Sequence, residues 1–351
     1  MGLPNIIIEF KSKASTAIKR GERGIVAVMV IEEVEKPTVT KIEDITQIPE
    51  GLTEANTAYL ERAFLGGQNP VKYVQLVQAA SVADGLPLLE TFKFNYLAAP
   101  HEVTADEVTT IITCIKTMRD NKNLKVKAVL PNAKGDHEGI INFTTTDIVV
   151  GENTYTAAEY CSRMAGLLAG TPLSVSCTYY VLSEVDDVPK FSRSELDERI
   201  DKGELLIFHD GEKVKVGREC NSLQTIGQEK GDIYKSIKAV DIMDMIYDDI
   251  HTTVEDNYIG KYANNYDNKC LIIVAIQTYL EKLRDEALLD NDISVGINLT
   301  KQTQWLKENG VDVSKMSEQE IKEANTKSWI FIAGKYKILY AIEDADVEFE
   351  I

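Results

Sequence analysis

Residues 24–31 read GIVAVMVI, with Ile or Val at five of the eight positions and no polar side chain. A short run that is continuously apolar, rather than alternating, is typical of a strand buried on both faces. We therefore expect residues 24–31 to form a strand inside the core, with other elements packed above and below it.

Strand-like and helix-like segments alternate after this run. A capping box of Thr104 and Glu107 begins one helix, and Gly66 with Gly67 ends another as a C-cap. The expected helices are residues 53–65, 104–118, 156–168 and 193–202. The expected strands are residues 36–42, 71–77, 92–98, 125–130, 139–143 and 176–182, with a hairpin of 205–209 and 213–216. Such alternation predicts a layered α/β domain with a mostly parallel sheet.

The pattern becomes helical beyond about residue 231. Apolar residues recur at helical spacing in residues 233–250 and 269–289, short helices are expected at 303–308 and 317–324, and residues 329–351 read as two strands around a short turn. The fold class is therefore mixed α/β and α+β: a small strand-rich unit, a central layered α/β domain, and a helical C-terminal domain ending in a β-hairpin, with extended terminal arms. The expected parts are an N-terminal arm (1–23), the strand-rich unit (24–90), the central domain (91–231) and the C-terminal domain (232–351), whose last part (about 335–351) is a second arm.

Both terminal segments have the alternating pattern of a strand, so each presents one apolar face. An unpaired strand pairs readily with another strand through its backbone, either within the chain or in a neighbouring copy. We expect these arms to make contacts between subunits. The expected contact residues are Ile6, Ile8, Phe10, Lys11, Lys13, Val347, Glu348, Phe349, Glu350 and Ile351.

The two arms also carry opposite charge. Residues 1–24 hold five Lys or Arg against two Glu, whereas the C-terminal segment has five acids and no neighbouring cation. These acids are Glu343, Asp344, Asp346, Glu348 and Glu350. Opposite charge favours pairing of one arm with the other and disfavours pairing of like ends.

Composition excludes several classes of partner. The chain of 351 residues has a net charge of −18 at pH 7, which argues against a general binder of nucleic acid or of a membrane surface. No apolar run is long enough to span a bilayer, and the N-terminal region lacks the layout of a signal peptide. We therefore expect no nucleic acid and no membrane among the partners, and synthesis in the cytoplasm.

The sequence shows no catalytic motif. It contains no GxxxxGK[ST], GxGxxG or GxSxG pattern, and its four histidines have no evident Ser or Cys partner. Five scattered cysteines form no CxxC pair, and all but Cys220 lie in apolar surroundings, where a small buried residue is expected. These cysteines are Cys114, Cys161, Cys177, Cys220 and Cys270. We expect no enzyme activity and no cofactor.

Two groups of residues are weak candidates for a metal site. Asp136, His137 and Glu138 are consecutive between two glycines, and an exposed polar turn is the preferred interpretation because adjacent side chains do not converge. Residues Asp248 and Glu255 share a helical face with His251, where a solvated acidic face is preferred. No metal is therefore expected.

Several short motifs together carry a family resemblance. Residues 165–174 read AGLLAGTPLS and residues 221–225 read NSLQT. They are accompanied, in order along the chain, by GLPNI at 2–6, GEL at 203–205 and YIGK at 258–261. With these motifs the chain resembles contractile tail sheath proteins of bacteriophages and phage-tail-like bacteriocins, in particular the short sheath proteins of PBSX-type prophages. The resemblance covers essentially the whole chain.

The resemblance implies a mechanical function. Subunits of such sheaths form stacked rings around a rigid tube, exchange terminal strands with neighbours, and contract to drive the tube through a bacterial envelope. The implied partners are further copies of the chain, a tail tube protein, and baseplate and tail terminator proteins. A non-contractile structural protein of a similar particle is the alternative, and an α/β enzyme that uses a metal or a nucleotide is a third hypothesis.

Overall fold

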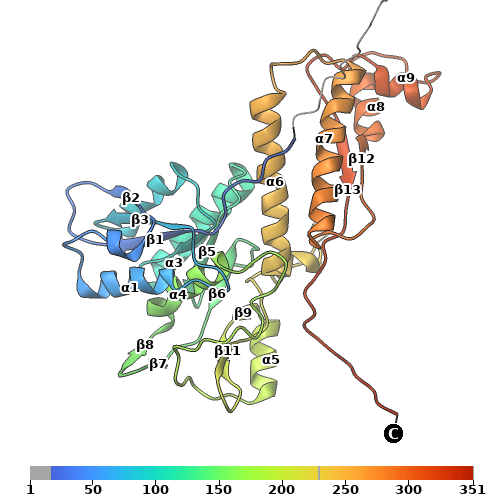
Figure 1. The fold of residues 1–351 in the computed structure, drawn as a ribbon. Helices are drawn as coiled ribbons and strands as arrows, with labels where there is room; N and C mark the ends of the chain where they lie inside the picture. The colour runs from blue at the N-terminus through green and yellow to red at the C-terminus, as the bar shows by residue number, and fades with distance from the viewer. Residues whose placement is uncertain (1–16, 228–229, 351) are drawn as a thin grey trace, which may run out of the picture. The chain divides into compact units, whose positions relative to one another are not determined.

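The computed structural model describes residues 17–227 and 230–350, which form two compact units (Figure 1). The sheet unit has residues 22–245 and 340–350, and the helical unit has residues 17–21 and 246–339. The division falls within the long helix α6 (Ile237–Asn257). Each unit is described by itself below.

A seven-stranded sheet organises the sheet unit, in the order β2-β3-β1-β4-β5-β6-β9. Its strands are β1 (Ile25–Ile31), β2 (Thr38–Ile42), β3 (Tyr73–Ala79), β4 (Tyr96–Ala98), β5 (Lys127–Pro131), β6 (Ile140–Phe143) and β9 (Glu204–Leu205). All neighbouring strands are parallel except β2, which runs antiparallel to β3 at one edge. The expectation of a mostly parallel sheet is confirmed.

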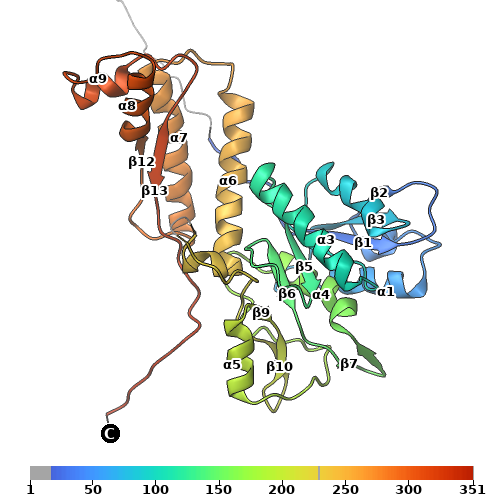
Figure 2. The ribbon, with the colours of Figure 1, turned by 180° about the vertical axis from the view of Figure 1, so that it is seen from behind.

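Strand β1 lies between β3 and β4 and is buried on both faces, as its sequence predicts. Val26, Val28 and Val30 face the helices α1 (Glu54–Phe64) and α4 (Ala157–Ala169). The alternate residues, Ile25 and Met29 among them, face α3 (Ala105–Lys116), α2 (Val82–Gly85) and the 3₁₀ turn η2 (Leu86–Glu90). Burying an aliphatic side chain of this size contributes about 1.5–3 kcal/mol. The result is a three-layer α/β unit; Figure 2 shows the side on which α3 lies.

The glycines of the AGLLAG segment allow α1 and α4 to pack closely. A Cβ atom at Gly166 would lie only 2.1 Å from the carbonyl oxygen of Ala63, and one at Gly170 would lie 2.2 Å from that of Asn69. No other residue fits without moving backbone. One motif behind the family resemblance therefore has a packing explanation.

Smaller elements complete the sheet unit. They are η1 (Ile45–Gln47), the π-helical turn η3 (Thr117–Asn121), α5 (Arg193–Asp201), η4 (Asp232–Lys235), and the hairpins β7–β8 (Ile148–Val150, Asn153–Tyr155) and β10–β11 (Ile207–His209, Val214–Val216). Thr104, Thr156 and Ser192 each begin a helix with a capping box. The helices and the β10–β11 hairpin lie where the sequence predicts them, within a few residues.

The strand expected at residues 176–182 is wrong. The chain turns there, with a hydrogen bond from the Tyr180 N–H to the Cys177 carbonyl, and Tyr179 has a left-handed φ of 59°. Only an isolated bridge between Val181 and Lys215 remains of strand pairing. Local side-chain hydrogen bonds of Ser176 and Thr178 favour the turn over an extended strand.

The helical unit is built around α7 (Tyr266–Asp285), whose buried face includes Ile272, Ile276 and Leu280. Helices α8 (Leu299–Glu308) and α9 (Glu318–Glu323) pack together, because Gln302 Nε2 donates to the carbonyl of Ile321 at 2.5 Å. Strands β12 (Ser294–Ile297) and β13 (Ile332–Lys335) form a two-stranded antiparallel sheet.

The pairing of β13 differs from that expected for the C-terminal hairpin. Strand β13 falls where its first strand is predicted, but it pairs with β12, from 35 residues earlier in the chain, counted from Ile297 to Ile332. The second predicted strand, from Asp346 onward, is absent among residues 336–350, which form no strand. A strand needs a partner for its backbone groups, and residues 346–350 have none among the described residues.

The fold class is confirmed: a mixed α/β sheet unit, followed by a helical region that ends in a β-ribbon. Strands from both sides of residue 90 belong to the same sheet. The division into parts at residues 23, 90 and 231 stays a prediction.

Two carboxylates at the start of α6 are held by a buried ion cluster of the sheet unit. Lys127 of β5 places its Nζ atom 2.9 Å from Asp241 and 2.7 Å from Asp244. Arg119 of η3 makes two hydrogen bonds of 2.9 Å to Asp244, and the Tyr96 hydroxyl donates to Asp241 at 2.7 Å. Each buried charge therefore has a partner of opposite sign, as burial requires.

Replacing Asp244 by Ala leaves Lys127 and Arg119 buried with one carboxylate fewer. We expect Asp244→Ala to lower the free energy of unfolding by about 3–5 kcal/mol, the usual cost of breaking a buried ion pair. Denaturant unfolding measures this. The matched control is Asp197→Ala, which removes an exposed ion pair of α5 with Arg193 and should change stability little. Equal effects of the two variants would contradict the importance of the cluster.

The same cluster predicts a dependence on pH. Burial raises the pKa of Asp244, but the charges of Lys127 and Arg119 outweigh it and lower the pKa to about 2. The unfolded value is about 3.9, so the stabilisation is complete above pH 4 and is lost as pH falls toward 2. We expect the stability difference between wild type and Asp244→Asn to shrink by about half between pH 6 and pH 3. Denaturant unfolding at each pH measures it, and a constant difference would contradict the assignment.

Candidate functional site

The loop of Asp136, His137 and Glu138 is not the exposed turn expected from the sequence. Asp136 stays near the surface, where its carboxylate accepts backbone hydrogen bonds from Gln224 and Thr225, but His137 and Glu138 are buried. Lys230 lies 2.9 Å from Glu138 and matches its charge, and Asp120 lies 3.2 Å from the His137 Nε2 atom. The sequence did not show that tertiary folding brings these cations and acids together.

Asp120, His137 and Glu138 each place one possible metal-ligand atom within 4.8 Å of the others. The Nδ1 atom of His137 accepts a hydrogen bond from the Gly139 N–H at 3.0 Å, so the neutral ring carries its proton on Nε2, toward Asp120. A metal ion needs an unprotonated nitrogen and would lie beside the Lys230 ammonium. Burial lowers the pKa of His137, which favours the neutral ring. The group is therefore better described as a buried ion network than as a metal site.

The other candidate groups also have ordinary roles. His251 is exposed and lies 3.6 Å from Glu255, as a surface ion pair one helical turn apart. All five cysteines are free, and Cys220 is buried like Cys161 and Cys177, although the sequence placed it in less apolar surroundings. The expectation of burial is wrong for Cys114 and Cys270, which are only partly buried. Burial raises the pKa of the Cys220 thiol to about 12, which leaves it unreactive.

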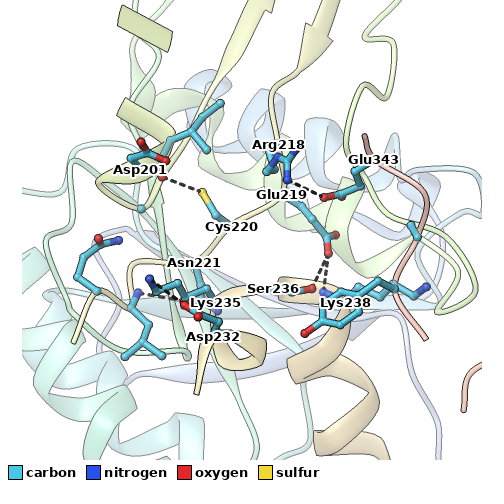
Figure 3. Close-up of a pocket in the computed structure, with 16 residues that line it drawn as sticks. Asp201, Arg218, Glu219, Cys220, Asn221, Asp232, Lys235, Ser236, Lys238 and Glu343 are labelled. Carbon is cyan, nitrogen blue, oxygen red and sulfur yellow. Dashed lines mark hydrogen bonds and ion pairs between the residues drawn. The ribbon is translucent and has the colours of Figure 1, made fainter. Parts of the chain in front are cut away.

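The C-terminal residues are fastened to the sheet unit at one point. The hydroxyls of Ser176 and Thr178 lie 2.8 and 2.5 Å from Oε1 of Glu343 and donate to it. Arg218 lies 3.8 Å from the other oxygen of Glu343 and also pairs with Asp344 (Figure 3). We call the side chains of Ser176, Thr178 and Arg218 the clasp, and residues 340–350 the tail.

The backbone around the clasp is held in an unusual conformation. Tyr179 follows Thr178 directly and adopts a φ of 59°, which costs on the order of 1–3 kcal/mol for a residue other than glycine. The Tyr179 N–H donates to the Val216 carbonyl at 3.0 Å, and the Glu219 N–H donates to the Thr178 hydroxyl at 2.9 Å. These bonds hold the turn that directs both hydroxyls toward Glu343.

A cavity of about 290 Å³ lies beside the clasp, between the tail and the segments that follow α5 and β11. Tyr340, Ala341 and Glu343 form its tail side (Figure 3). Burial raises the pKa of Glu219 in its wall, whose carboxylate accepts hydrogen bonds from the Ser236 hydroxyl and the Lys238 N–H. The clasp and this wall together form the part of the sheet unit that meets the tail.

The tail exposes large apolar side chains on both sides of its contact with the clasp. Ile342 is 93% exposed, Val347 65% and Phe349 82%. Figures 1 and 2 draw the tail without helix or strand up to the C-terminal end. Among the described residues of the tail, none after Asp344 makes a hydrogen bond or ion pair in the structure.

The N-terminal segment is fastened in the helical unit. The Gly21 N–H donates to Oδ1 of Asp249 at 2.7 Å, and the Tyr279 hydroxyl donates to Oδ2 of the same carboxylate at 2.6 Å. Arg20 pairs with Glu286 at 2.6 Å. Residues 17–21, which belong to the expected N-terminal arm, are therefore bound to α6, to α7 and to the residue that follows α7.

The arm residues predicted from the sequence are only partly described. Ile6, Ile8, Phe10, Lys11, Lys13 and Ile351 lie outside the described residues. Val347, Glu348, Phe349 and Glu350 are exposed and form no strand in the single chain. Their contact with another subunit stays a prediction.

Sequence reasoning missed the clasp. Glu343 and Asp344 were counted among acids without a neighbouring cation, but Arg218 is their cation. No spacing in the sequence connects positions 126 residues apart.

One further observation concerns membranes. In residues 17–227 and 230–350, no helix combines the length and the apolar character needed to cross a bilayer.

Comparison with known proteins identifies the family. Residues 72–222 match the model of the phage tail sheath protein central domain, and residues 229–349 match that of the phage tail sheath C-terminal domain. The tail sheath protein of Clostridium phage phiCD119 is 38% identical, with 100% of this chain and 99% of the relative covered. The PBSX protein XkdK of Bacillus subtilis is 28% identical, with 61% of this chain and 49% of that protein covered.

The fold agrees with a solved sheath. The helical sheath of the anti-feeding prophage in its contracted state has a TM-score of 0.68 and 14% identity, with 100% of this chain and 99% of that chain covered. Because two sheath models match most of the chain and a phage sheath relative spans all of it, the chain belongs to the phage tail sheath proteins, which are structural proteins of the tail and not enzymes.

Proposed function

We propose that this chain polymerises into a contractile sheath around a tail tube, and that the sheath contracts to drive the tube through a bacterial envelope. The terminal arms link neighbouring subunits by donating strands. Its partners are further copies of the chain, the tube protein, and the baseplate and terminator proteins at the two ends. The protein is made in the bacterial cytoplasm and becomes part of a phage tail or a tail-like particle.

The observation that carries the proposal is the exposure of the tail. Val347 and Phe349 alternate with Glu348 and Glu350, the pattern of a strand with one apolar face, yet 65% of Val347 and 82% of Phe349 are exposed. Monomeric proteins seldom expose large apolar side chains in a row unless the surface serves an interaction. A strand of a second copy would satisfy the backbone of the tail and cover these side chains.

The attachment of both arms supports the same proposal. The tail is bound to the sheet unit at Glu343, and the described end of the N-terminal segment is bound in the helical unit at Gly21. An arm fixed at its base carries force from one folded subunit to the next, which contraction requires. A free linker would instead stretch before it transmitted force.

The β12–β13 sheet is a candidate acceptor for a donated strand. It has two strands, and a sheet of this size gains stability from additional strands. Among the described residues, neither outer edge pairs with a third strand. Lys335 and Lys337 on and after β13 suit the acidic tail of another copy.

Contraction needs two stable arrangements of the same subunits. The solved sheath of the anti-feeding prophage, which has the same fold, is in a contracted state. Strand donation supports such a change because the donated strands keep subunits connected while the folded units move. No nucleotide is needed if the energy is stored during assembly of the extended form.

Electron microscopy of the purified protein, with and without its tube protein, tests the proposal. Rings or short wide tubes, lengthened and ordered by the tube protein, would support a sheath. A protein that stays monomeric under both conditions would overturn it.

Two matched double variants test the tail itself. We expect Val347→Ser with Phe349→Ser to abolish polymerisation, because the donated strand loses its apolar face and its register. Glu348→Gln with Glu350→Gln removes two charges from the other face, keeps the apolar face intact and should still polymerise. Sedimentation and electron microscopy measure the polymer.

All four side chains are exposed in the single chain, so neither double variant should change its unfolding midpoint. Normal polymers of the Val347→Ser, Phe349→Ser protein would show that the tail is not a donated strand.

A further inference from the structure

The clasp contacts the tail at its base and leaves everything beyond it exposed. Glu343 is the fixed point, with a side chain 20% exposed and two hydroxyl donors at 2.8 and 2.5 Å. Asp344 is the outer contact, with a side chain 79% exposed and a pairing to Arg218 alone. Adjacent carboxylates of equal charge therefore differ in how firmly they are held.

Two separate parts of the chain build the clasp. Ser176 and Thr178 come from the turn after α4, and Arg218 comes from the segment after β11. The Ser176 oxygen accepts the Thr178 N–H at 3.0 Å, and the Ser176 hydroxyl lies within donor distance of both the Thr178 hydroxyl, at 2.9 Å, and the Glu343 carboxylate, at 2.8 Å. The left-handed Tyr179 maintains this turn at an energetic cost. A strained turn that presents two donors to one carboxylate is a built site, not an incidental contact.

We propose that the clasp of Ser176, Thr178 and Arg218 sets the direction in which the tail leaves the subunit, and so selects the neighbouring copy that receives the strand. This inference rests on the proposed function, in which the tail is a donated strand. A tail of few residues reaches only a small region when its base is fixed. A released tail explores many directions and has a lower effective concentration at any one acceptor.

The central variant is Glu343→Ala, with Asp346→Ala as its matched control. Both remove one carboxylate from the tail, and neither touches the apolar strand face. We expect Glu343→Ala to raise the concentration needed for polymerisation by about ten-fold, because the tail must be ordered on binding rather than beforehand. We expect the polymers that do form to have less regular helical order. Asp346→Ala should be within about two-fold of wild type, because its side chain is exposed and does not contact the clasp.

A variant of the clasp, rather than of the tail, tests the same contact from its other side. Ser176→Ala removes one donor to Glu343 while the tail keeps its natural sequence. It should shift the critical concentration in the same direction as Glu343→Ala. Combining both changes should add little to Glu343→Ala alone, because the two residues act through one contact.

Sedimentation measures the critical concentration, and electron microscopy measures the helical order. Circular dichroism and thermal unfolding establish that each variant is folded before assembly. If Glu343→Ala and Ser176→Ala polymerise like wild type while the Val347→Ser, Phe349→Ser protein does not, the clasp proposal is wrong and the donated strand stands. If all of them polymerise like wild type, the donated strand is wrong and the clasp proposal falls with it.

Discussion

The burial of β1 on both faces is the constraint on which the sheet unit depends. A strand without polar side chains has to be covered above and below, so helices are needed on each side of the sheet. Helices α1 and α4 cover one face and α3 covers the other. The strands must then be joined by crossovers, which makes the sheet parallel at its centre. The close packing of Gly166 against Ala63 follows from the same need to bring two helices onto one face.

Buried charged side chains of the sheet unit are paired with side chains of opposite charge. Lys127 lies in a central strand. Burial of its ammonium group would be very unfavourable without the carboxylates of Asp241 and Asp244. A second network around His137 and Glu138 follows the same rule, with Lys230 as its cation. These networks contain the residues that resemble a catalytic or metal site, yet their partners give them a structural role. This agrees with membership in a family of structural tail proteins.

The tail has the opposite character to the core. Its apolar side chains are exposed, and its backbone has no partner strand within the part of the chain that the structure describes. Exposing such a segment to water is unfavourable for a monomer. In a polymer the same segment can pair with an edge strand of a second copy. In our proposal, the clasp at Glu343 sets the direction in which the tail leaves the subunit. A rigid core, fixed arm bases and exposed arm tips together make a subunit suited to linked assembly.

The sequence by itself determined the elements of this protein and the apolar face of its tail. Periodicity and capping residues located β1, α3 and α4 closely, because the interactions that form a helix or mark a buried strand are local. Tertiary structure alone decided the turn at Tyr179, the pairing of β13 with β12, and the ion partners of His137 and Glu343. These depend on groups far apart in the chain, up to 167 residues for Ser176 and Glu343, and no local pattern records which distant group will be near.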